Sequence, residues 1–553
     1  MTGLSTAAHS AMPPQVTIPR VYNAAHDLLA RNTGRADKTA FIDMDGAHSY
    51  GELTARVLAV QGAFAALGLV REDRIMLALL DTIDFPAVFL GAIRGGIVPV
   101  AANTLLTTAD FEFMLRDSRA RALVVSAALL PAFAPLIGKI ESLMHVIVSG
   151  DGAQTIGGTQ AKIVGASGST KVHGLQALVG AAVAGVASTG TGGAQPGAPT
   201  LPVATTCADE ACFWLYSSGS TGTPKGTVHL HSHMILTAEL YAKPVLGIRE
   251  DDVVFSAAKF FFAYGLGNAL TFPMSVGATT VLLNTRPTPD AVFDLLIKHQ
   301  PTIFYGVPTL YAAMLAAPNA PARAALNLRV CTSAGEALPA DIGKRFTEQY
   351  GVEVLDGIGS TEMLHIFISN RPGQVRYGTT GVPVPGYEIR LLDENGQPVA
   401  DGEIGEMQVS GATAAIMYWN SRERTKNTFL GPWTRSGDKY IRDADGYYTY
   451  CGRNDDMLKV GGIYVSPFEV EAALQTHPAV LEAAVVAKED DQHLIKPKAF
   501  VVFKQGQSAS DEELKAHVKA VLAPYKYPRW IESVAELPKT ATGKIQRFKL
   551  RGK

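Results

Sequence analysis

Residues 216–226 read Tyr216-Ser217-Ser218-Gly219-Ser220-Thr221-Gly222-Thr223-Pro224-Lys225-Gly226 and directly follow the apolar segment 211–215. A strand that leads into such a loop can present backbone N–H groups, hydroxyls and an ammonium to a polyphosphate. Glycine suits this loop because a side chain would hold the backbone away from the phosphate oxygens and forbid positive φ. The run is not a Walker A loop, since Lys225 follows Pro224 and precedes Gly226. The alternative is a solvated Gly/Ser linker, which would not account for a regular Ser/Thr/Gly run that ends in one proline and one lysine.

Length and composition indicate a well-packed protein of at least two domains. The 553 residues exceed what one hydrophobic core usually supports. A hydrophobic content of 47% with 18% charged residues carries no signature of disorder. The formal net charge of −2 argues against nucleic acid or an anionic membrane as a partner. Any phosphate-bearing ligand must therefore be held by local donors.

Cysteine usage and hydropathy point to the cytoplasm. The four cysteines, at positions 207, 212, 331 and 451, show no Cys-x-x-Cys spacing, so we expect neither a disulfide framework nor a zinc site. The first residues lack the apolar core of a signal peptide. The uncharged run at 175–187 is too short and too rich in Gly and Ala to span a bilayer. We therefore expect a cytoplasmic protein with no membrane partner.

The first half of the chain has the pattern of an α/β protein. In residues 21–150, helical periodicity alternates with short β-branched runs such as 75–78 and 123–126, which predicts βαβ units around a parallel sheet. Residues 151–206 are dominated by Gly, Ala, Ser and Thr, and we interpret them as a surface excursion or flexible insertion without chemistry. The alternation resumes after the loop, with predicted strands at 253–256, 279–283, 302–305 and 328–331.

The second half ends in a smaller unit. Residues 381–452 are rich in β-type sequence with closely spaced turns. Beyond them we expect a helix at 468–474, paired strands at 483–487 and 498–503, and a helix capped by Ser510. The predicted fold is thus α/β. A large N-terminal domain, residues 1–454, consists of βαβ subdomains and a β-rich subdomain, and a small mobile α+β C-terminal domain, residues 455–553, is hinged at Asp455.

Two further motifs with possible ligand chemistry follow predicted strands. Gly357-Ile358-Gly359-Ser360-Thr361-Glu362 comes after the strand 352–355 and can offer an N–H cradle and a carboxylate for a divalent cation. An ordinary turn is the alternative. Thr434-Arg435-Ser436-Gly437-Asp438 places a carboxylate after a tight turn, where it suits bidentate binding of ribose hydroxyls. The alternative there is an Asx turn.

Two more motifs lie near the domain junction and the C-terminus. Gly452-Arg453-Asn454-Asp455-Asp456 combines a guanidinium with two acids and leads to Lys459-Val460-Gly461-Gly462. A solvated charge run is the competing interpretation. The segment 538–545 presents Lys544 directly after a glycine. Such a lysine is otherwise only a solubilising charge in a tail.

These five segments, in this order and spacing, resemble the adenylate-forming superfamily of acyl-CoA synthetases, firefly luciferase and peptide-synthetase adenylation domains, over nearly the whole chain. The Tyr216 region, residues 356–362 and the run Lys259-Phe260-Phe261-Phe262-Ala263-Tyr264-Gly265-Leu266-Gly267 look most like benzoate–CoA ligases. The resemblance implies an enzyme in which a carboxylate attacks the α-phosphate of ATP to give an acyl-adenylate and pyrophosphate. The thiol of coenzyme A then displaces AMP.

The resemblance also implies an ATP site. The β- and γ-phosphates would be held by Ser217, Ser218, Gly219, Ser220, Thr221, Gly222 and Lys225. Glu362 would help to bind Mg²⁺, and Thr361 would contact the α-phosphate. Asp438 and Arg453 would hold the ribose. The adenine would be lined by Gly335, Glu336, Ala337, Asp356, Gly357 and Ile358, with Asp356 accepting a hydrogen bond from its amino group. Many relatives have tyrosine at the position of Ile358, so stacking on the adenine is expected to be aliphatic here.

One site would serve two reactions in turn. By resemblance, Lys544 reaches the carboxylate and α-phosphate during adenylation, as a point charge that can be withdrawn. Rotation of the small domain about Asp455 then replaces it with Lys459 and with Gly461 and Gly462 of a coenzyme A tunnel. The pattern around Lys544 also resembles a modification site, which implies a protein acetyltransferase and a deacetylase as partners.

The acid is predicted from the aromatic run. Phe262, Ala263, Tyr264 and Gly265 stand where the family builds its acyl pocket, and Ala334, Gly359 and His365 occupy its other positions. Flat aromatic walls with small residues between them favour a flat ring over a long chain. We therefore expect benzoate, with hydroxy-, amino- or fluorobenzoates as poorer substrates. The run could instead be buried core, and His365 could be a histidine behind the pocket.

Several functions stay open on the sequence alone. The chain could be another aryl-acid or medium-chain acid–CoA ligase, or an adenylation module that loads a carrier protein. A nonenzymatic ATP-binding regulator is disfavoured by the retained Glu362, Asp438, Arg453 and Lys544. The oligomeric state is also open, with a homodimer as one option.

Overall fold

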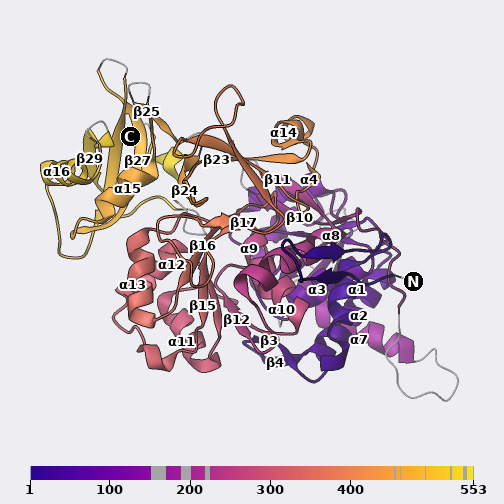
Figure 1. The fold of residues 1–553 in the computed structure, drawn as a ribbon. Coiled ribbons are helices and arrows are strands. Elements are labelled where there is room, and N and C mark those ends of the chain that lie inside the picture. Colours follow the sequence, from indigo (N-terminus) through magenta and orange to yellow (C-terminus); the bar gives the residue numbers. More distant parts are fainter. Residues whose placement is uncertain are drawn as a thin grey trace.

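Figure 1 shows the computed structural model, in which a large body formed by most of the chain carries a small C-terminal unit at one edge. The structure describes residues 2–150, 170–187, 201–217, 224–453, 456–460, 463–491, 494–523, 526–539 and 545–551. An α/β body followed by a small C-terminal unit is the predicted fold class, and it is confirmed.

The first large sheet has eight strands in the order β21-β11-β10-β6-β5-β7-β8-β9. The strands are β5 (Arg74–Ala78), β6 (Val98–Ala101), β7 (Ala122–Ser126), β8 (His145–Ser149), β9 (Lys171–Gly174), β10 (Ala211–Ser217), β11 (Lys225–Leu230) and β21 (Met417–Tyr418). The pairs from β10 to β9 are parallel, whereas β11 and β21 add an antiparallel edge. The central strands β7 and β8 are buried at every position, as expected for a sheet covered on both faces.

The second large sheet has nine strands in the order β18-β17-β16-β15-β14-β12-β13-β3-β4. They are β3 (Thr39–Asp43), β4 (Gly46–Ser49), β12 (Val253–Ser256), β13 (Thr279–Val281), β14 (Ile303–Gly306), β15 (Val330–Ser333), β16 (Val354–Gly359), β17 (Ile366–Ser369) and β18 (Val382–Pro383). The run from β3 to β16 is parallel, so the ends of β15 and β16 open onto the same edge. The strands expected after residue 250 are confirmed, although β13 ends at Val281 rather than residue 283.

Helices connect the parallel strands. The principal ones are α1 (Ala24–Ala30), α2 (Tyr50–Ala66), α3 (Asp84–Arg94), α4 (Thr108–Ser118), α8 (His231–Thr237), α10 (Phe272–Val276), α11 (Pro289–His299), α12 (Pro308–Ala316) and α13 (Ala340–Tyr350). Shorter segments are β1 (Thr6–Ala8), β2 (Gln15–Thr17), α5 (Leu130–Phe133), α9 (Ala263–Leu266) and the π-helical η4 (Ala238–Leu246) and η5 (Gly267–Thr271). Local chemistry sets several starts: Ser49 and Glu52 form a reciprocal capping box at α2.

The expectation for residues 151–206 was wrong in part. Within that stretch, β9 pairs with β8 and completes the first sheet, and α7 (Leu175–Ala187) packs on α2. Leu175 is 2% exposed, and Leu178 and Val179 lie against the same core. The returning segment is also anchored, since the Pro202 carbonyl accepts a hydrogen bond from the Gln61 side chain at 3.0 Å. A composition of Gly, Ala, Ser and Thr concealed these apolar positions. Residues 151–169 and 188–200 lie outside the described residues.

The predicted β-rich stretch forms a five-stranded antiparallel sheet. It consists of β19 (Glu388–Leu392), β20 (Gly405–Ser410), β22 (Phe429–Leu430), β23 (Trp433–Arg442) and β24 (Tyr448–Arg453). Helix α14 (Arg422–Thr428) precedes β22. The chain thus passes from the second sheet to β21 of the first sheet within this region, and so ties the parts of the large body together.

The C-terminal unit has the predicted α+β composition. Its elements are β25 (Leu458–Val460), β26 (Ile463–Val465), α15 (Pro467–Gln475), β27 (Val480–Glu489), β28 (Ile495–Phe503), α16 (Asp511–Val521) and β29 (Trp530–Ser533). The expected hairpin is confirmed by the antiparallel pairing of β27 with β28, and the Ser510 hydroxyl caps α16 by accepting the Glu513 N–H at 3.2 Å. Two apolar clusters, one on each face of this sheet, form its core.

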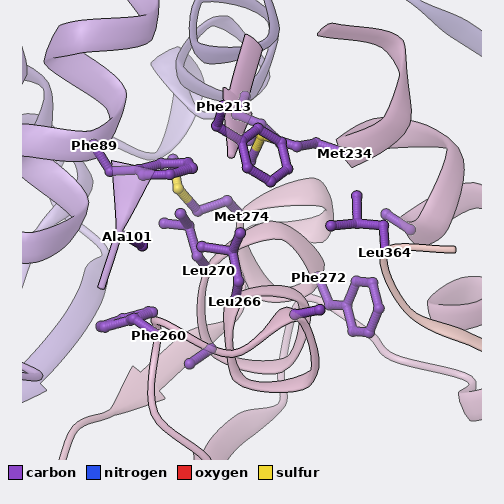
Figure 2. Close-up of a cluster of buried hydrophobic side chains, with 14 of the residues drawn as sticks. Phe89, Ala101, Phe213, Met234, Phe260, Leu266, Leu270, Phe272, Met274 and Leu364 are labelled. Carbon is purple, nitrogen blue, oxygen red and sulfur yellow. The ribbon is translucent and has the colours of Figure 1, made fainter. Parts of the chain in front are cut away.

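The core of the large body joins the two large sheets. Figure 2 shows Phe89 and Phe213 from the first sheet's side meeting Phe260, Leu266 and Leu270 from the second. The rings of Phe85 and Phe260 stack with centroids 4.6 Å apart. The segment from Phe260 to α10 therefore sits between the sheets and is fixed from both sides. In the parts of the chain that the structure describes, no helix has the length and apolar character needed to cross a membrane.

Candidate functional site

The predicted phosphate loop joins two antiparallel strands of the first sheet. β10 and β11 are paired up to Ser217 and Lys225, so both ends of the loop are held by the last pair of a hairpin. Trp214, in the middle of β10, is 2% exposed and stacks near Trp419. The hairpin is therefore a fixed base for the loop, whose residues 218–223 lie outside the described residues.

Lys225 meets a carboxylate and a phenol from distant parts of the chain. Its Nζ lies 2.9 Å from Glu362 Oε1 and 2.8 Å from the Tyr418 hydroxyl oxygen. The Tyr418 hydroxyl donates to the same Glu362 oxygen at 2.7 Å. Three elements thus converge, namely β11, the turn after β16, and β21.

These contacts keep Glu362 ionised. Burial opposes the charge, but the Lys225 ammonium and the hydrogen bond from Tyr418 outweigh it and lower the pKa of Glu362 to about 2. An ionised carboxylate suits Mg²⁺, which is commonly held by one or two carboxylates together with substrate phosphates. No group of three or more His, Cys, Asp or Glu side chains that could hold a metal exists among the described residues. A cation here would thus depend on phosphate oxygens as well as on Glu362.

The turn that carries Glu362 is held by the main chain. Three consecutive carbonyls accept hydrogen bonds from other segments: Thr361 from His229 Nε2 at 2.7 Å, Glu362 from the Ala415 N–H at 2.7 Å, and Met363 from the Thr413 hydroxyl at 2.8 Å. With its backbone fixed in this way, the turn presents the Glu362 side chain in one direction.

Asp438 and Arg453 face each other across β23 and β24. They are cross-strand partners, and Arg453 Nη1 donates to Asp438 Oδ1 at 3.0 Å. The Asp438 side chain is only 8% exposed, whereas that of Arg453 is 52% exposed. Gly437 has a φ of +78°, and a Cβ there would come within 2.9 Å of the Arg453 guanidinium. Glycine is therefore needed for the turn that brings the carboxylate to the arginine.

The predicted adenine segments end neighbouring parallel strands. Gly335, Glu336 and Ala337 follow β15, and Asp356 pairs with Ser333 in β16. Burial raises the pKa of the Asp356 carboxyl well above its usual range. Its Oδ1 is buried without a hydrogen-bond partner in the described part of the chain, which leaves an oxygen available to a ligand donor. Gly357 and Ile358 continue β16, and Ile358 is half-buried.

Glu336 makes a contact that the sequence did not predict. Its Oε1 accepts the backbone N–H of Ile545 at 3.2 Å. The adenine segment thereby touches the C-terminal unit immediately after Lys544.

The predicted acyl-pocket residues come together around α9. Phe260 and Phe261 are 0% and 4% exposed and belong to the core, whereas Phe262 and Tyr264 are half-buried. The Tyr264 hydroxyl lies 2.5 Å from Thr332 Oγ1 in β15, next to the predicted Ala334. A Cβ on Gly265 would lie 2.0 Å from the Lys259 carbonyl oxygen, so the packing of the backbone requires glycine there.

His365 packs against the rings of Tyr264 and Phe272. Its ring lies 5.6 Å from that of Tyr264 and 4.5 Å from that of Phe272, measured between centroids. His365 Nε2 is within 3.3 Å of the Tyr264 carbonyl and 3.2 Å of Asn268 Oδ1, so this nitrogen carries the proton. Burial lowers its pKa to about 3. A Cβ on Gly359 would lie 2.6 Å from the His365 carbonyl oxygen, so Gly359 permits the close pairing of β16 with β17.

Some predicted residues fall where the structure gives no description. Lys459 lies in β25, where only its backbone is described. The predicted residues outside the described ranges are Ser218, Gly219, Ser220, Thr221, Gly222, Asp455, Gly461, Gly462 and Lys544.

Sequence reasoning missed residues that touch the site from other elements. Tyr418 lies in a two-residue strand with no motif around it, and His229 and Thr332 lie inside buried strands. One signal could have pointed to His229: a histidine in a buried strand such as β11 needs a hydrogen-bond partner, because a fully buried polar side chain is costly without one.

Known proteins match the chain over its whole length. Residues 28–419 match the AMP-binding enzyme family, and residues 469–544 match the AMP-binding enzyme C-terminal domain. The benzoate–CoA ligase of Thauera aromatica is 58% identical over 559 aligned residues, covering 100% of both chains. The 4-hydroxybenzoate–CoA/benzoate–CoA ligase of Rhodopseudomonas palustris is 49% identical, covering 96% of this chain and 94% of that protein.

A solved structure agrees with these sequence matches. A benzoate CoA ligase from Burkholderia xenovorans LB400 superposes with a TM-score of 0.84 at 53% identity, covering 96% of this chain and 100% of that chain. The larger family match spans most of the chain and includes the hairpin of Lys225, the turn of Glu362 and the strand of Tyr418. The family match thus covers all three elements that meet at Lys225, and the chain belongs to the AMP-binding enzyme family.

Proposed function

We propose that this protein is an ATP-dependent benzoate–CoA ligase that forms benzoyl-CoA, AMP and pyrophosphate through a benzoyl-adenylate. The observation that carries the proposal is the ionised Glu362, held by Lys225 and Tyr418 beside the ends of the predicted phosphate loop. The aromatic segment around α9 and the end-to-end similarity to a benzoate–CoA ligase support the choice of acid.

In the first half-reaction, a benzoate oxygen attacks the α-phosphorus, and the bond from that phosphorus to the oxygen bridging to the β-phosphate breaks. Pyrophosphate leaves with the bonding electron pair. Residues from Ser217 to Lys225 would bind the β- and γ-phosphates, and Thr361 would contact the α-phosphate. Glu362 would hold Mg²⁺, which when bound neutralises charge on the departing pyrophosphate.

The nucleoside would lie along the ends of β15, β16 and β23. Asp438 would accept hydrogen bonds from the ribose hydroxyls, with its carboxylate oriented by Arg453. The unpartnered Oδ1 of Asp356 would accept a hydrogen bond from the adenine amino group. Residues 335–337, with Gly357 and Ile358, would line the ring. Because Ile358 is aliphatic, it would contribute packing without aromatic stacking.

The second half-reaction would use the C-terminal unit. We place the domain boundary at 454/455, with Asp455 as hinge. Lys544 would serve adenylation, and after rotation Lys459, Gly461 and Gly462 would line the path of coenzyme A. The thiol would release its proton to solvent, its sulfur would attack the carbonyl carbon, and AMP would leave with the electrons of the broken carbon–oxygen bond. A cytoplasmic location, acetylation of Lys544 and a homodimer stay predictions.

The acid would bind between Phe262, Tyr264 and the end of β15, with Ala263 and Ala334 leaving room for a flat ring. Tyr264 is fixed by Thr332, and His365 is fixed by Asn268, so the walls are rigid. A rigid aromatic slot favours unsubstituted benzoate over flexible medium-chain acids. The second candidate function is that of a 4-hydroxybenzoate–CoA ligase, because the similar protein from Rhodopseudomonas palustris is named as a ligase of both 4-hydroxybenzoate and benzoate.

A panel of acids in a pyrophosphate-release assay with ATP, Mg²⁺ and coenzyme A tests the proposal. We expect kcat/KM to be highest for benzoate and about 10-fold or more lower for 4-hydroxybenzoate, 2-aminobenzoate and hexanoate, because one misplaced polar group or lost ring contact is worth about 1–3 kcal/mol. A higher kcat/KM for a hydroxybenzoate would replace benzoate as the substrate. AMP release that does not depend on coenzyme A would contradict thioester formation and favour carrier loading.

A further inference from the structure

A buried pair of histidines lies directly behind the turn that carries Glu362. His229 in β11 and His233 in α8 are 0% and 2% exposed. His229 Nε2 lies 2.7 Å from the Thr361 carbonyl oxygen, and its Nδ1 lies 3.0 Å from His233 Nδ1. The Phe213 ring stacks on His229 with centroids 5.4 Å apart. The imidazole is therefore fixed in plane by a ring and at both nitrogens by polar partners.

The hydrogen bonds define the tautomer of His229. A carbonyl oxygen only accepts, so Nε2 must carry the proton that it donates to Thr361. Burial keeps the ring neutral, lowering the pKa of His229 to about 4, so Nδ1 carries a lone pair. His233 Nδ1 must then be the protonated partner that donates to it. The Leu230 N–H also points at His233 Nδ1, at 3.4 Å, but it makes no hydrogen bond to that nitrogen when the nitrogen carries the proton for the 3.0 Å pair with His229. His233 thus selects the form of His229 that can donate to Thr361.

The bond to Thr361 orients the peptide that joins Thr361 to Glu362. In a trans peptide the C=O and N–H point in opposite directions. Because His229 draws the Thr361 carbonyl toward β11, the Glu362 N–H faces the other way, where it contacts its own carboxylate. The Leu364 N–H, from within the turn, also donates to the Thr361 carbonyl, at 3.2 Å, and the Ala415 and Thr413 bonds act on the next two carbonyls. His229 thus supplies the shorter bond to the first carbonyl, and it does so from another element.

We propose that His229 is a positioning residue for adenylate formation, acting through the Thr361–Glu362 peptide on the groups that meet the α-phosphate and the metal. A fully buried imidazole would be a costly way to fill space, because an apolar side chain needs no hydrogen bonds there. What His229 supplies that leucine does not is one N–H at the carbonyl adjoining Glu362. The inference rests on the proposed function, since it assigns His229 to the first of its two half-reactions.

Four variants separate positioning from packing. His229→Leu removes the donor. His229→Gln can place its amide nitrogen near the position of Nε2, whereas His229→Asn is one methylene shorter and cannot reach Thr361. His231→Leu is the matched control: this histidine is two residues away and 2% exposed, but its Nδ1 accepts the Ala24 N–H at 3.2 Å, away from the turn.

Three measurements are made on each variant: benzoate-dependent ATP–pyrophosphate exchange, thioester formation from supplied benzoyl-adenylate, and the rise in Tm caused by Mg²⁺ with ATP. Loss of one hydrogen bond predicts an exchange rate about 10-fold lower in His229→Leu and His229→Asn. We expect His229→Gln and His231→Leu to stay within about threefold of the wild type. The Mg²⁺–ATP shift in Tm should be reduced in the first two variants only, and thioester formation should be little changed in all four.

Equal effects of His229→Leu and His231→Leu on exchange and on the Tm shift would overturn the proposal, as would equal loss of both half-reactions. If His229→Leu does not fold, the exchange rates of His229→Gln and His229→Asn are compared instead. An exchange rate in His229→Gln no higher than that in His229→Asn would reject the positioning role. Failure of the proposed function can be distinguished from failure of the His229 proposal, because the wild type itself would then show no benzoate-dependent ATP–pyrophosphate exchange. The Mg²⁺–ATP shift in Tm, measured without acid, would still test His229.

Discussion

Glu362 owes its ionised state to residues far away in the chain. Lys225 lies 137 residues before it and Tyr418 lies 56 residues after it. Lys225 and Glu362 could be predicted together because each ends a recognisable glycine-rich motif. Tyr418 could not, because its place depends on β21 joining the edge of β11, a pairing of only two residues. The role of His229 could not be predicted either, because its partner is a backbone carbonyl, and every residue has one.

Replacing Tyr418 with phenylalanine removes one donor from Glu362 and leaves the ring in place. A hydrogen bond to a charged group contributes about 1.5–3 kcal/mol, so we expect adenylation to slow about 10- to 100-fold. The variant should form thioester from supplied benzoyl-adenylate at nearly the wild-type rate. Quenched-flow measurement of each half-reaction checks this. Tyr447→Phe is the control, since within the described ranges the Tyr447 hydroxyl donates to the Gln374 carbonyl, at 3.2 Å, and not to Glu362. Normal adenylation in Tyr418→Phe would show that Lys225 alone orients the carboxylate.

At the scale of elements, α9 and α7 show where patterns succeed and where they fail. Residues 262–265 of the run at 259–267 were predicted to line the acyl pocket, with buried core as the alternative for the run. In the structure Phe260 and Phe261 enter the core, while Phe262 and Tyr264 stay half-buried. Parallel strands such as β12 and β14 were predictable because short β-branched runs alternate with helical periodicity. Helix α7 was not, since its Gly and Ala positions look like linker and its apolar face becomes visible only against α2.

Glycine has opposite consequences in these two helices. In α9, a Cβ at Gly265 would meet the Lys259 carbonyl oxygen at 2.0 Å, so Gly265→Ala must displace backbone and should destabilise the protein by about 3 kcal/mol and weaken benzoate binding. In α7, a Cβ at Gly180 meets nothing within 4 Å, so Gly180→Ala should add up to about 1 kcal/mol through helix propensity. Urea unfolding of both variants, with benzoate KM for the first, measures the contrast. Equal free energies of unfolding in the two variants would contradict it.

At the scale of the whole molecule, the large body depends on buried neutral histidines. Burial lowers the pKa of His231 to about 4 and that of His365 to about 3, from about 6.5 in an unfolded chain. Because the folded-state pKa values are depressed, the folded state holds fewer protons, and stability is lost as pH falls below 6.5. Asp81 acts in the opposite sense, since burial raises its pKa to about 6.

The free energy of unfolding should therefore fall between pH 7 and pH 5. His231, His365 and also His229, whose pKa burial lowers to about 4, each contribute about 2 kcal/mol of loss at pH 5, whereas Asp81 returns about 1 kcal/mol, so the histidines outweigh Asp81. Urea titrations followed by tryptophan fluorescence measure this, because Trp214 and Trp419 lie in the large body with their ring centroids 4.4 Å apart. A His231→Gln, His365→Gln double variant should have a flatter pH profile. An unchanged midpoint at pH 5 in the wild type would show that these rings are protonated without unfolding.

The contacts of the turn at Thr361 are completed only late in the synthesis of the chain. Its first carbonyl is held by β11, translated long before it, but the second and third wait for Ala415 and Thr413, and the carboxylate waits for Tyr418. A nascent chain that has emerged only as far as Glu362 already has most strands of both large sheets and Lys225, yet Tyr418, the second group that holds the Glu362 carboxylate, is still to be synthesised. Biosynthesis thus separates the synthesis of most of the scaffold from the completion of the contacts around Glu362 by the 56 residues between Glu362 and Tyr418.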